Sequence, residues 1–468
     1  MNYLVLDSGT SSTKAFLFNR NGKIIYSNKI KHQLNRPRKF YVECDANIIL
    51  TACKNLFYDM LNFSGDTPII NAGLAVQRST FLFWEKKSCK PISPALSWQD
   101  SRAQSIINIF SQHADTLWYK TGTPLSAHFG GPKFFHMADH NKELKDAINS
   151  NEVYFGPLSA FLSQAITGTP GVDESIACRS LLYNIHKRTW SKFALNLFGV
   201  NKKCLPPITP VYYKYGNFFD TDITLNIVIG DQQSALIGQG GLIPNTIAGN
   251  LGTSGSLQFN AGNNPIIIPG LISSLLYSNN KSKYYMVEGT INACNSIFYH
   301  LETKLNIPHN KMLWDQRVSQ VKTNGIFIPG FSGLAAPYWI SGFNDVYIDL
   351  ENTSKDEIIR AGMESIAFLI NDIYRCLILA IDQKPKIIYF SGGAARHPLL
   401  QFISDIIDIP IGYSSMKDRT AYGVYILLNP KHKFNKLKNA NYIFEPNPGK
   451  FTHQKKQKWA DAISSLLG

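Results

Sequence analysis

Asp231 stands where a predicted strand meets a predicted helix, in the stretch VIGDQQSALIGQG (228–240). The run before it, LNIVIG, is apolar and β-branched, which is typical of a buried parallel strand. The run after it carries Ala and Leu at helical spacing. A carboxylate at such a junction has two interpretations. It caps the helix by accepting from the first free amides, or it points into a site at the strand end.

Two Gly-Thr-Ser turns indicate phosphate binding. Gly9-Thr10-Ser11 follows the strand YLVLD, which ends in Asp7, and leads into a predicted hairpin, AFLF–NRNG–KIIY. Gly252-Thr253-Ser254 lies between apolar runs in IAGNLGTSGSLQF, half a chain length later. Such turns direct backbone amides and hydroxyls at one point, which suits phosphate oxygens. Their recurrence predicts duplicated domains facing one cleft, which Asp231 would then enter.

A glycine turn in the C-terminal half is a third candidate for a ligand-binding segment. In KPKIIYFSGGAARHPLLQF, a predicted strand, the turn 391–394 and an amphipathic helix follow one another. Glycines there let a flat ring or a sugar approach the backbone closely. A tight turn without a ligand is the alternative.

The elements that position these residues require more than one domain. The chain has 468 residues, too many for one ordinary core. Its 44% hydrophobic and 17% charged residues are typical of a globular protein and argue against extended disorder. The N-terminus lacks the features of a signal peptide, and no apolar run approaches the ~20 residues of a membrane span. We therefore expect a cytoplasmic protein without a membrane partner.

Cysteine spacing and charge exclude further classes. The seven cysteines are scattered singly without a CxxC pair, which disfavours a zinc site or a disulfide framework and favours buried thiols in a reducing compartment. The net charge of +14 comes from basic residues spread along the chain. Without a basic helix that carries interleaved aromatics, we expect no nucleic-acid partner, only a general attraction for anions such as nucleotides.

Together these stretches resemble the FGGY carbohydrate kinases, and among them the glycerol kinases, over nearly the whole chain. The matching stretches are LDSGTSSTKAFLF, AVQRSTFLFW, PISPALSWQDSRA, GTPLSAHF, DESIACRSLLYNIHKRTW, GDQQSALIGQG, GNLGTSGSLQF, PGFSGLAAPYW, IRAGMESIAF and GGAARHPLLQF. The resemblance implies an α/β fold of two ribonuclease-H-like domains of the actin/hexokinase ATPase type, with an interdomain catalytic cleft. It assigns substrate binding, the first phosphate loop and the catalytic base to residues 1–239. The second phosphate loop and adenosine binding fall to residues 240–468.

The same resemblance implies transfer of the ATP γ-phosphoryl group to a primary hydroxyl of a small sugar or polyol, with Mg²⁺. Asp231 matches the general base, and Asp7 matches the aspartate that helps hold Mg²⁺ through water; we expect Asp231 to face the metal as well. The positions that match ATP contacts are Thr10, Ser11, Ser12, Lys14, Gly252, Thr253, Asn295, Gly393, Ala394 and His397. The positions that match substrate contacts are Arg78, Ser79, Trp98, Asp100, His128, Asp231 and Gln232.

Several of these residues also have ordinary structural explanations. Lys14 has the sequence context of an exposed strand lysine, and Arg78 that of a surface arginine at a strand end. Trp98 and Asp100 are equally consistent with a core aromatic and an ion pair to Arg102. On the nucleotide side, family members often have Asn at the position of His397 and Gly at that of Asn295, which puts the purine contacts in question.

Two departures bear on the substrate. Glycerol kinases carry Arg-Glu where this chain has Arg78-Ser79, and Tyr where it has His128. Loss of the Glu carboxylate removes a strong acceptor and opens space, and on a substrate as small as glycerol each lost hydrogen bond costs ~1 kcal/mol or more. We therefore expect a substrate of pentulose or pentitol size. Two alternatives stay open. His128 has a structural role only, or the protein is a glycerol kinase with an unusual pocket. Xylulokinases, with Met-His at Gln77-Arg78, fit less well.

Two other classes share the phosphate turns. An actin-like ATPase without small-molecule transfer would not need QRST, SWQDSRA and SAHF in the first half. A non-catalytic, ATP-binding regulatory protein would not need both Asp7 and Asp231. We therefore expect a working kinase with a small-molecule partner, and we leave a homodimer open.

Overall fold

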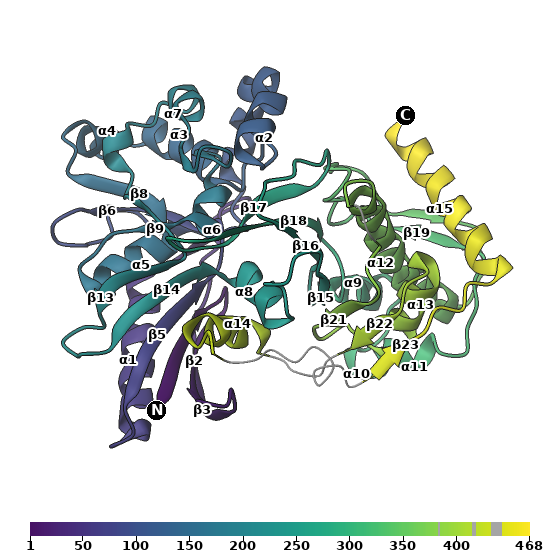
Figure 1. The fold of residues 1–468 in the computed structure, drawn as a ribbon. Coiled ribbons are helices and arrows are strands. Elements are labelled where there is room, and N and C mark those ends of the chain that lie inside the picture. Colours follow the sequence, from purple (N-terminus) through teal and green to yellow (C-terminus); the bar gives the residue numbers. More distant parts are fainter. Residues whose placement is uncertain (382–383, 414–417, 432–441) are drawn as a thin grey trace.

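Two mixed β-sheets form the body of the described chain, and they lie side by side in Figure 1, the first at left and the second at right. The computed structural model describes residues 1–381, 384–413, 418–431 and 442–468. The first sheet runs in the order β13 (Tyr212–Asn217), β14 (Thr224–Gly230), β5 (Ile69–Val76), β1 (Asn2–Ser8), β2 (Ser12–Asn19) and β3 (Ile24–Lys31). The second runs in the order β17 (Ile272–Ser278), β18 (Lys283–Ile291), β16 (Gly255–Gly262), β15 (Ile247–Leu251), β21 (Ile388–Ser391), β22 (Ile411–Tyr413) and β23 (Tyr442–Phe444).

Five adjacent strands of each sheet repeat the same pairing pattern. β1 pairs antiparallel with β2 and parallel with β5, and β15 pairs antiparallel with β16 and parallel with β21. The next strands outward repeat the pattern. β3 pairs antiparallel with β2, and β18 with β16, while β14 pairs parallel with β5, and β22 with β21. Each Gly-Thr-Ser turn joins the central strand to its antiparallel neighbour. The predicted duplication is therefore confirmed.

Helices on the first sheet bury apolar residues at helical spacing. α1 (Ala46–Ser64) begins after Asp45, whose side chain accepts from the backbone N–H of Asn47, and it ends at Gly65. Its buried face consists of Ala46, Ile49, Ala52, Cys53, Leu56, Phe57, Met60 and Ser64. This stripe packs on the apolar face of β1, β2 and β5 to form the first core. The other helices of this half are α2 (Ala114–Thr121), α3 (Gly130–His140), α4 (Lys142–Asn149), α5 (Leu158–Thr167), α6 (Glu174–Ala177) and α7 (Lys192–Leu197), with 3-10 turns η1 (Arg102–His113), η2 (Cys178–Ser180) and η3 (Lys202–Cys204).

A smaller sheet extends the first half beside the site. It runs in the order β4 (Glu43–Cys44), β7 (Ala95–Leu96), β6 (Phe81–Glu85) and β8 (Val153–Pro157). Its aromatic strand β6 packs with α3 in a separate core that includes Phe81, Phe83 and Phe134. Short ribbons pair β9 (Val172–Asp173) with β12 (Ile208–Thr209), β10 (Tyr183–Asn184) with β11 (Thr189–Trp190), and β19 (Ile326–Ile328) with β20 (Val346–Ile348).

The second half is built around a long buried helix, α12 (Lys355–Ile378). A capping box between Ser354 and Glu357 starts this helix. Around it lie α9 (Ser296–Lys304), α10 (His309–Met312), α11 (Trp314–Arg317), α13 (His397–Ile407) and α15 (Lys450–Leu467), and their apolar faces close the largest core.

Helix α14 (Arg419–Leu428) crosses from the second half to the first. It packs with α8 (Asp231–Gly238) on the first sheet, so that Tyr422 and Val424 share a core with Tyr3 and Phe18. The two helices approach closely because both carry glycine at the crossing: a Cβ on Gly238 would lie 2.1 Å from the Arg419 carbonyl oxygen. The predicted boundary at 239/240 separates the strands of the two large sheets. It does not separate all the helices, because α14 comes after the boundary and packs on the first sheet.

In the part of the chain that the structure describes, no helix combines the length and apolar character needed to cross a bilayer.

Candidate active site

A cavity of about 370 Å³ lies where the two sheets meet. The adjacent parallel strands β1, β5 and β14 end at one edge of the first sheet, since Val76 is paired with both Ser8 and Gly230. The segments that follow these strands therefore reach the cavity together. Predicted residues that line it are Thr10, Arg78, Ser79, Trp98, His128, Asp231 and Gln232, and they face Ser254, Glu288, Thr290 and Trp339 from the second half.

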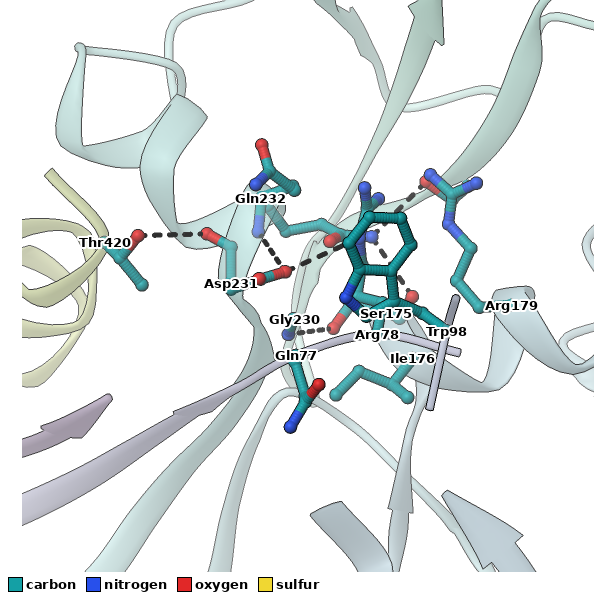
Figure 2. A network of polar contacts seen from close by, with 12 residues as sticks. Gln77, Arg78, Trp98, Ser175, Ile176, Arg179, Gly230, Asp231, Gln232 and Thr420 are labelled. Carbon is teal, nitrogen blue, oxygen red and sulfur yellow. Dashed lines mark hydrogen bonds and ion pairs between the residues drawn. The ribbon is translucent and has the colours of Figure 1, made fainter. Parts of the chain in front are cut away.

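Asp231 is the first residue of α8 and lines the cavity, and Figure 2 shows its carboxylate directed toward Arg78. The N-cap residue of this helix is Gly230, which makes no side-chain cap bond; Asp231 follows it, and its carboxylate both binds a free amide of the first turn and lines the cavity. Its Oδ1 accepts from the Gln232 backbone N–H at 2.8 Å and lies 3.6 Å from Arg78 Nε. Burial raises the pKa of Asp231, while Arg78 opposes this effect. A carboxylate with raised basicity in a cavity can accept a proton from a bound hydroxyl.

Arg78 is held by a carboxylate that the sequence did not reveal. Arg78 Nη1 and Nη2 lie 3.1 and 3.0 Å from the two oxygens of Glu288 on β18, and Arg179 also bonds this carboxylate. Glu288 is fully buried, and Gln258 donates to it at 3.4 Å. Burial alone would raise its pKa, but Arg179 and Arg78 lower the pKa of Glu288 to about 2. The sequence signal for this buried ion-pair cluster is a charged residue inside each of two otherwise apolar stretches, YYMVEGT and IACRSLL.

Ser79, Trp98 and His128 form one wall of the cavity. Ser79 adopts a left-handed backbone conformation, with φ at 60°. The Trp98 indole N–H donates to Thr10 Oγ1 at 2.9 Å, and His128 Nδ1 lies 3.0 Å from the Trp98 carbonyl oxygen. Because that partner is a carbonyl, Nδ1 carries the proton, and Nε2 of the neutral ring is an acceptor. Loss of solvation and the nearby Lys133 ammonium lower the pKa of His128.

Asp100, predicted as a substrate contact, does not line this cavity. Its fully buried carboxylate binds Arg102 Nε at 3.0 Å and accepts from the Val42 backbone N–H at 2.7 Å. Arg102 also pairs with Glu43 at 2.6 Å. The alternative interpretation, an ion pair beside the pocket, describes this residue.

Asp7 and Lys14 are cross-strand neighbours in the first hairpin. Lys14 Nζ lies 3.2 Å from Asp418 Oδ1, a partner that lies far away in the sequence. Burial, and then the charge of Asp231, raise the pKa of Asp7 to about 7; Asp418 adds to this and Lys14 opposes it. Carboxylates that oppose one another's ionisation are a suitable environment for a cation. No group of three His, Cys, Asp or Glu within the described residues is close enough to hold a metal alone, which suits Mg²⁺ bound largely through water and phosphate.

Each Gly-Thr-Ser turn is closed by a bond from the N–H of its glycine. The Gly9 N–H donates to the Ser12 carbonyl oxygen at 3.1 Å, and the Gly252 N–H donates to the Ser254 carbonyl oxygen, one residue nearer, at 2.9 Å. Ser11 accepts from the His32 N–H through its carbonyl. This bond fixes the first turn to the residue that follows β3; phosphate binding by the turn stays a prediction.

The residues predicted to bind adenosine gather near the second turn, with one exception. Asn295 donates its backbone N–H to the Gly252 carbonyl, and Ala394 donates to Leu251 at 2.9 Å. No atom comes within 4 Å of a Cβ placed on Gly393, so the space beside it is open. The His397 ring instead contacts the aromatic rings of Tyr442 and Phe444, at 4.7 and 4.6 Å between centroids.

Known proteins match the whole chain. Residues 2–238 match the N-terminal domain of the FGGY family of carbohydrate kinases, and residues 247–429 match its C-terminal domain. Glycerol kinase 1 of Thermotoga maritima is 29% identical over all of both chains. Glycerol kinase of Oceanobacillus iheyensis is 30% identical over 90% of this chain and 87% of its own. The crystal structure of Plasmodium falciparum glycerol kinase with ADP superimposes with a TM-score of 0.91 at 27% identity, over 100% of this chain and 98% of that one.

Proposed function

The chain belongs to the FGGY family of carbohydrate kinases, and we propose that it transfers the γ-phosphoryl group of ATP to a primary hydroxyl of a pentulose or pentitol. The observation that carries this proposal is the position of Asp231. Its carboxylate lines the cavity between two Gly-Thr-Ser turns, 3.6 Å from Arg78.

In this reaction Asp231 accepts the proton of the acceptor hydroxyl as its oxygen attacks the γ-phosphorus and the bond to the β-phosphate oxygen breaks. Phosphoryl transfer depends mainly on positioning and charge neutralisation, so a modest base suffices. Arg78 donates to the acceptor from a fixed position, because Glu288 holds both of its terminal nitrogens. Thr10 and Ser254 stand at the cavity for the transferred phosphoryl group.

Mg²⁺, when bound with ATP, neutralises phosphate charge. Asp7 is the carboxylate that would hold it through water, since burial and the neighbouring carboxylates Asp231 and Asp418 raise its pKa, which a cation would offset. The purine would lie beside Gly393 and Ala394, near the second turn. We assign no purine contact to His397.

The proposed substrate size depends on two residues of the wall, Ser79 and His128. Ser79 leaves space where glycerol kinases have Glu, and Glu288 does not replace that acceptor because Arg78, Arg179 and Gln258 already bind its oxygens. His128 Nε2 is an acceptor at the same cavity. A five-carbon acceptor can reach His128 and the space beside Ser79, while glycerol leaves them without a hydroxyl partner.

The second candidate is a glycerol kinase with an unusual pocket. It is favoured by the glycerol kinases that match this chain over its length. Its prediction is distinct: the specificity constant for glycerol would equal or exceed that of every pentulose and pentitol.

ADP release with a panel of polyols and ketoses, and without any acceptor, tests the proposal. We expect acceptor-dependent release that is fastest with a five-carbon compound. Acceptor-independent release would indicate an ATPase, and ATP binding without any release would indicate a regulatory protein. Asp231→Asn should lower turnover at least ~10²-fold, the loss of a general base, while Asp220→Asn at an exposed loop position should leave it unchanged. Near wild-type turnover of Asp231→Asn would refute the assignment of the base.

Restoring the glycerol-kinase residues tests substrate size directly. Ser79→Glu combined with His128→Tyr should raise the specificity constant for glycerol and lower that for the five-carbon acceptor, because the lost contacts are regained and the space is filled. An unchanged ratio of the two constants would contradict the role of this wall.

A further inference from the structure

Lys133 is a fully buried lysine beside the cavity. It lies in the first turn of α3 with 0% exposure. Its Nζ donates to the carbonyl oxygens of Ser79 at 2.8 Å and Ser97 at 2.7 Å, and lies 3.4 Å from that of Leu96. Within the described residues, no carboxylate lies within ion-pair distance of this ammonium. Such a group costs more to bury than an apolar side chain of the same length.

The segments joined by Lys133 are those that carry the cavity wall. Ser79 is itself a wall residue with a left-handed backbone, and Ser97 directly precedes Trp98. His128 lies just before α3, in the same segment as Lys133. Its Nδ1 bonds the Trp98 carbonyl at 3.0 Å. One ammonium therefore connects the three backbone segments on which Ser79, Trp98 and His128 stand.

A second buried lysine provides a contrast. Lys455 on α15 is 2% exposed, and its Nζ donates to the Thr323 carbonyl at 3.0 Å. It also pairs with Glu364 at 2.6 Å, so its charge is compensated. Lys455 ties α15 to the second half and does not line the cavity. Both lysines hold backbone carbonyls, but only Lys133 does so at the acceptor site.

We propose that Lys133 is a positioning residue that sets acceptor recognition by holding the Ser79, Trp98 and His128 segments in one arrangement. The inference rests on the proposed function, because it requires the acceptor to bind at this wall. Lys133 need not touch the acceptor. Displacement of a binding wall by about 1 Å is enough to cost ~10²-fold in rate.

The electrostatics of Lys133 make its effect dependent on pH. Burial lowers the pKa of Lys133 to about 7; Asp100 opposes this and Arg102 adds to it. The titratable groups that face Lys133 from neighbouring segments are Asp100, Arg102, Cys44 and His128. Loss of the proton leaves two N–H donors and no charge, which weakens the bonds to the three carbonyl oxygens.

Lys133→Met tests the proposal, with Lys455→Met as the matched control. We expect Lys133→Met to lower kcat/KM for the acceptor ~10²-fold, mainly through KM, while KM for ATP stays within about twofold. Lys455→Met should lose thermal stability without changing KM for the acceptor. Equal effects of the two variants on that KM would overturn the proposal, as would a folded Lys133→Met with unchanged KM.

The wild-type enzyme gives a second test if Lys133→Met does not fold. Its KM for the acceptor should rise as pH increases through about 7, while KM for ATP at saturating Mg²⁺ follows a different profile. A KM for the acceptor that is flat across this range would overturn the proposal. Absence of turnover with every acceptor would instead refute the proposed function, so the two failures are distinguishable.

Discussion

Glu288→Gln should damage acceptor recognition out of proportion to its effect on stability. The substitution keeps the size of the side chain and removes its charge. Glu288 is fully buried, and two arginines, Arg78 and Arg179, bind it. Without the carboxylate, Arg179 loses its compensating charge, Arg78 keeps only Asp231 at 3.6 Å, and Arg78 loses the paired contacts that fix its plane.

Two considerations give the size of the effect on folding. The arginines overcome burial and lower the pKa of Glu288 from its ordinary value of 4.5 to about 2, which corresponds to ~3 kcal/mol of stabilisation of the carboxylate. Breaking a buried ion pair from one side generally costs ~3–5 kcal/mol. We therefore expect Glu288→Gln to lose ~3 kcal/mol in the free energy of unfolding. Domains with ~5–15 kcal/mol of stability remain folded after such a loss.

Glu364→Gln is the matched control. Glu364 is also fully buried and bound by two cations, Arg360 at 2.7 Å and Lys455 at 2.6 Å, but it lies on α12 in the second half of the chain. Urea unfolding should show similar losses for the two variants. Steady-state kinetics should separate them, with kcat/KM for the acceptor reduced ~10²-fold only in Glu288→Gln. Parallel losses in stability and equal kcat/KM values would refute the role of Glu288 in holding Arg78.

Two other predictions follow from buried charges near the site. The folded-state pKa of Lys133 is about 7, below the ~10.4 of an unfolded lysine, so this residue contributes stability that is fully present above ~10.4 and is lost as pH falls through about 7. The difference in unfolding free energy between wild type and Lys133→Met should therefore change over this pH window. A constant difference would show that Lys133 keeps its proton. Asp7→Asn should raise the Mg²⁺ concentration for half-maximal activity ~10-fold or more, as for other residues that hold a metal through water, and an unchanged Mg²⁺ dependence would remove Asp7 from the metal site.

The duplicated architecture was predictable because its signals are local. Each central strand is a short apolar run, and each is followed by a Gly-Thr-Ser turn and a second strand, so two comparable stretches revealed both sheets. The parallel pairing of β1 with β5 and of β15 with β21 then follows from the chain connections. Helix α14 was not predictable in the same way, because its partner is fixed by contacts between segments far apart in the sequence, such as Gly423 with Ser234 and Val424 with Gly73.

The site was predicted where its residues lie in recognisable motifs. Asp231, Arg78, Trp98 and His128 reach one cavity, although their roles stay predictions. Asp100 does not reach the cavity, because Val42 and Arg102 already satisfy its carboxylate; the sequence offers the Arg102 ion pair as an alternative but does not reveal the bond from Val42.

The sequence does not single out Glu288, Arg179 and Lys133, because their roles depend on partners that lie elsewhere in the chain. Each looks like an ordinary charge in its own segment. The importance of Glu288 depends on Arg78, 210 positions away, and that of Lys133 depends on the carbonyl groups it reaches, which no residue type encodes.

The position of Glu288 has a consequence for the base. Arg78 lies between two carboxylates, Asp231 at 3.6 Å and Glu288 at 3.0 Å. An arginine free to pair fully with Asp231 would stabilise the anion and make it a weaker base. Glu288 holds the terminal nitrogens on the other side, and its own charge, like burial, raises the pKa of Asp231. The carboxylate that orients Arg78 therefore also limits how strongly Arg78 suppresses the basicity of Asp231. In the proposed reaction, acceptor recognition and proton acceptance would be coupled through this one arginine, so a substitution that frees Arg78 should affect both.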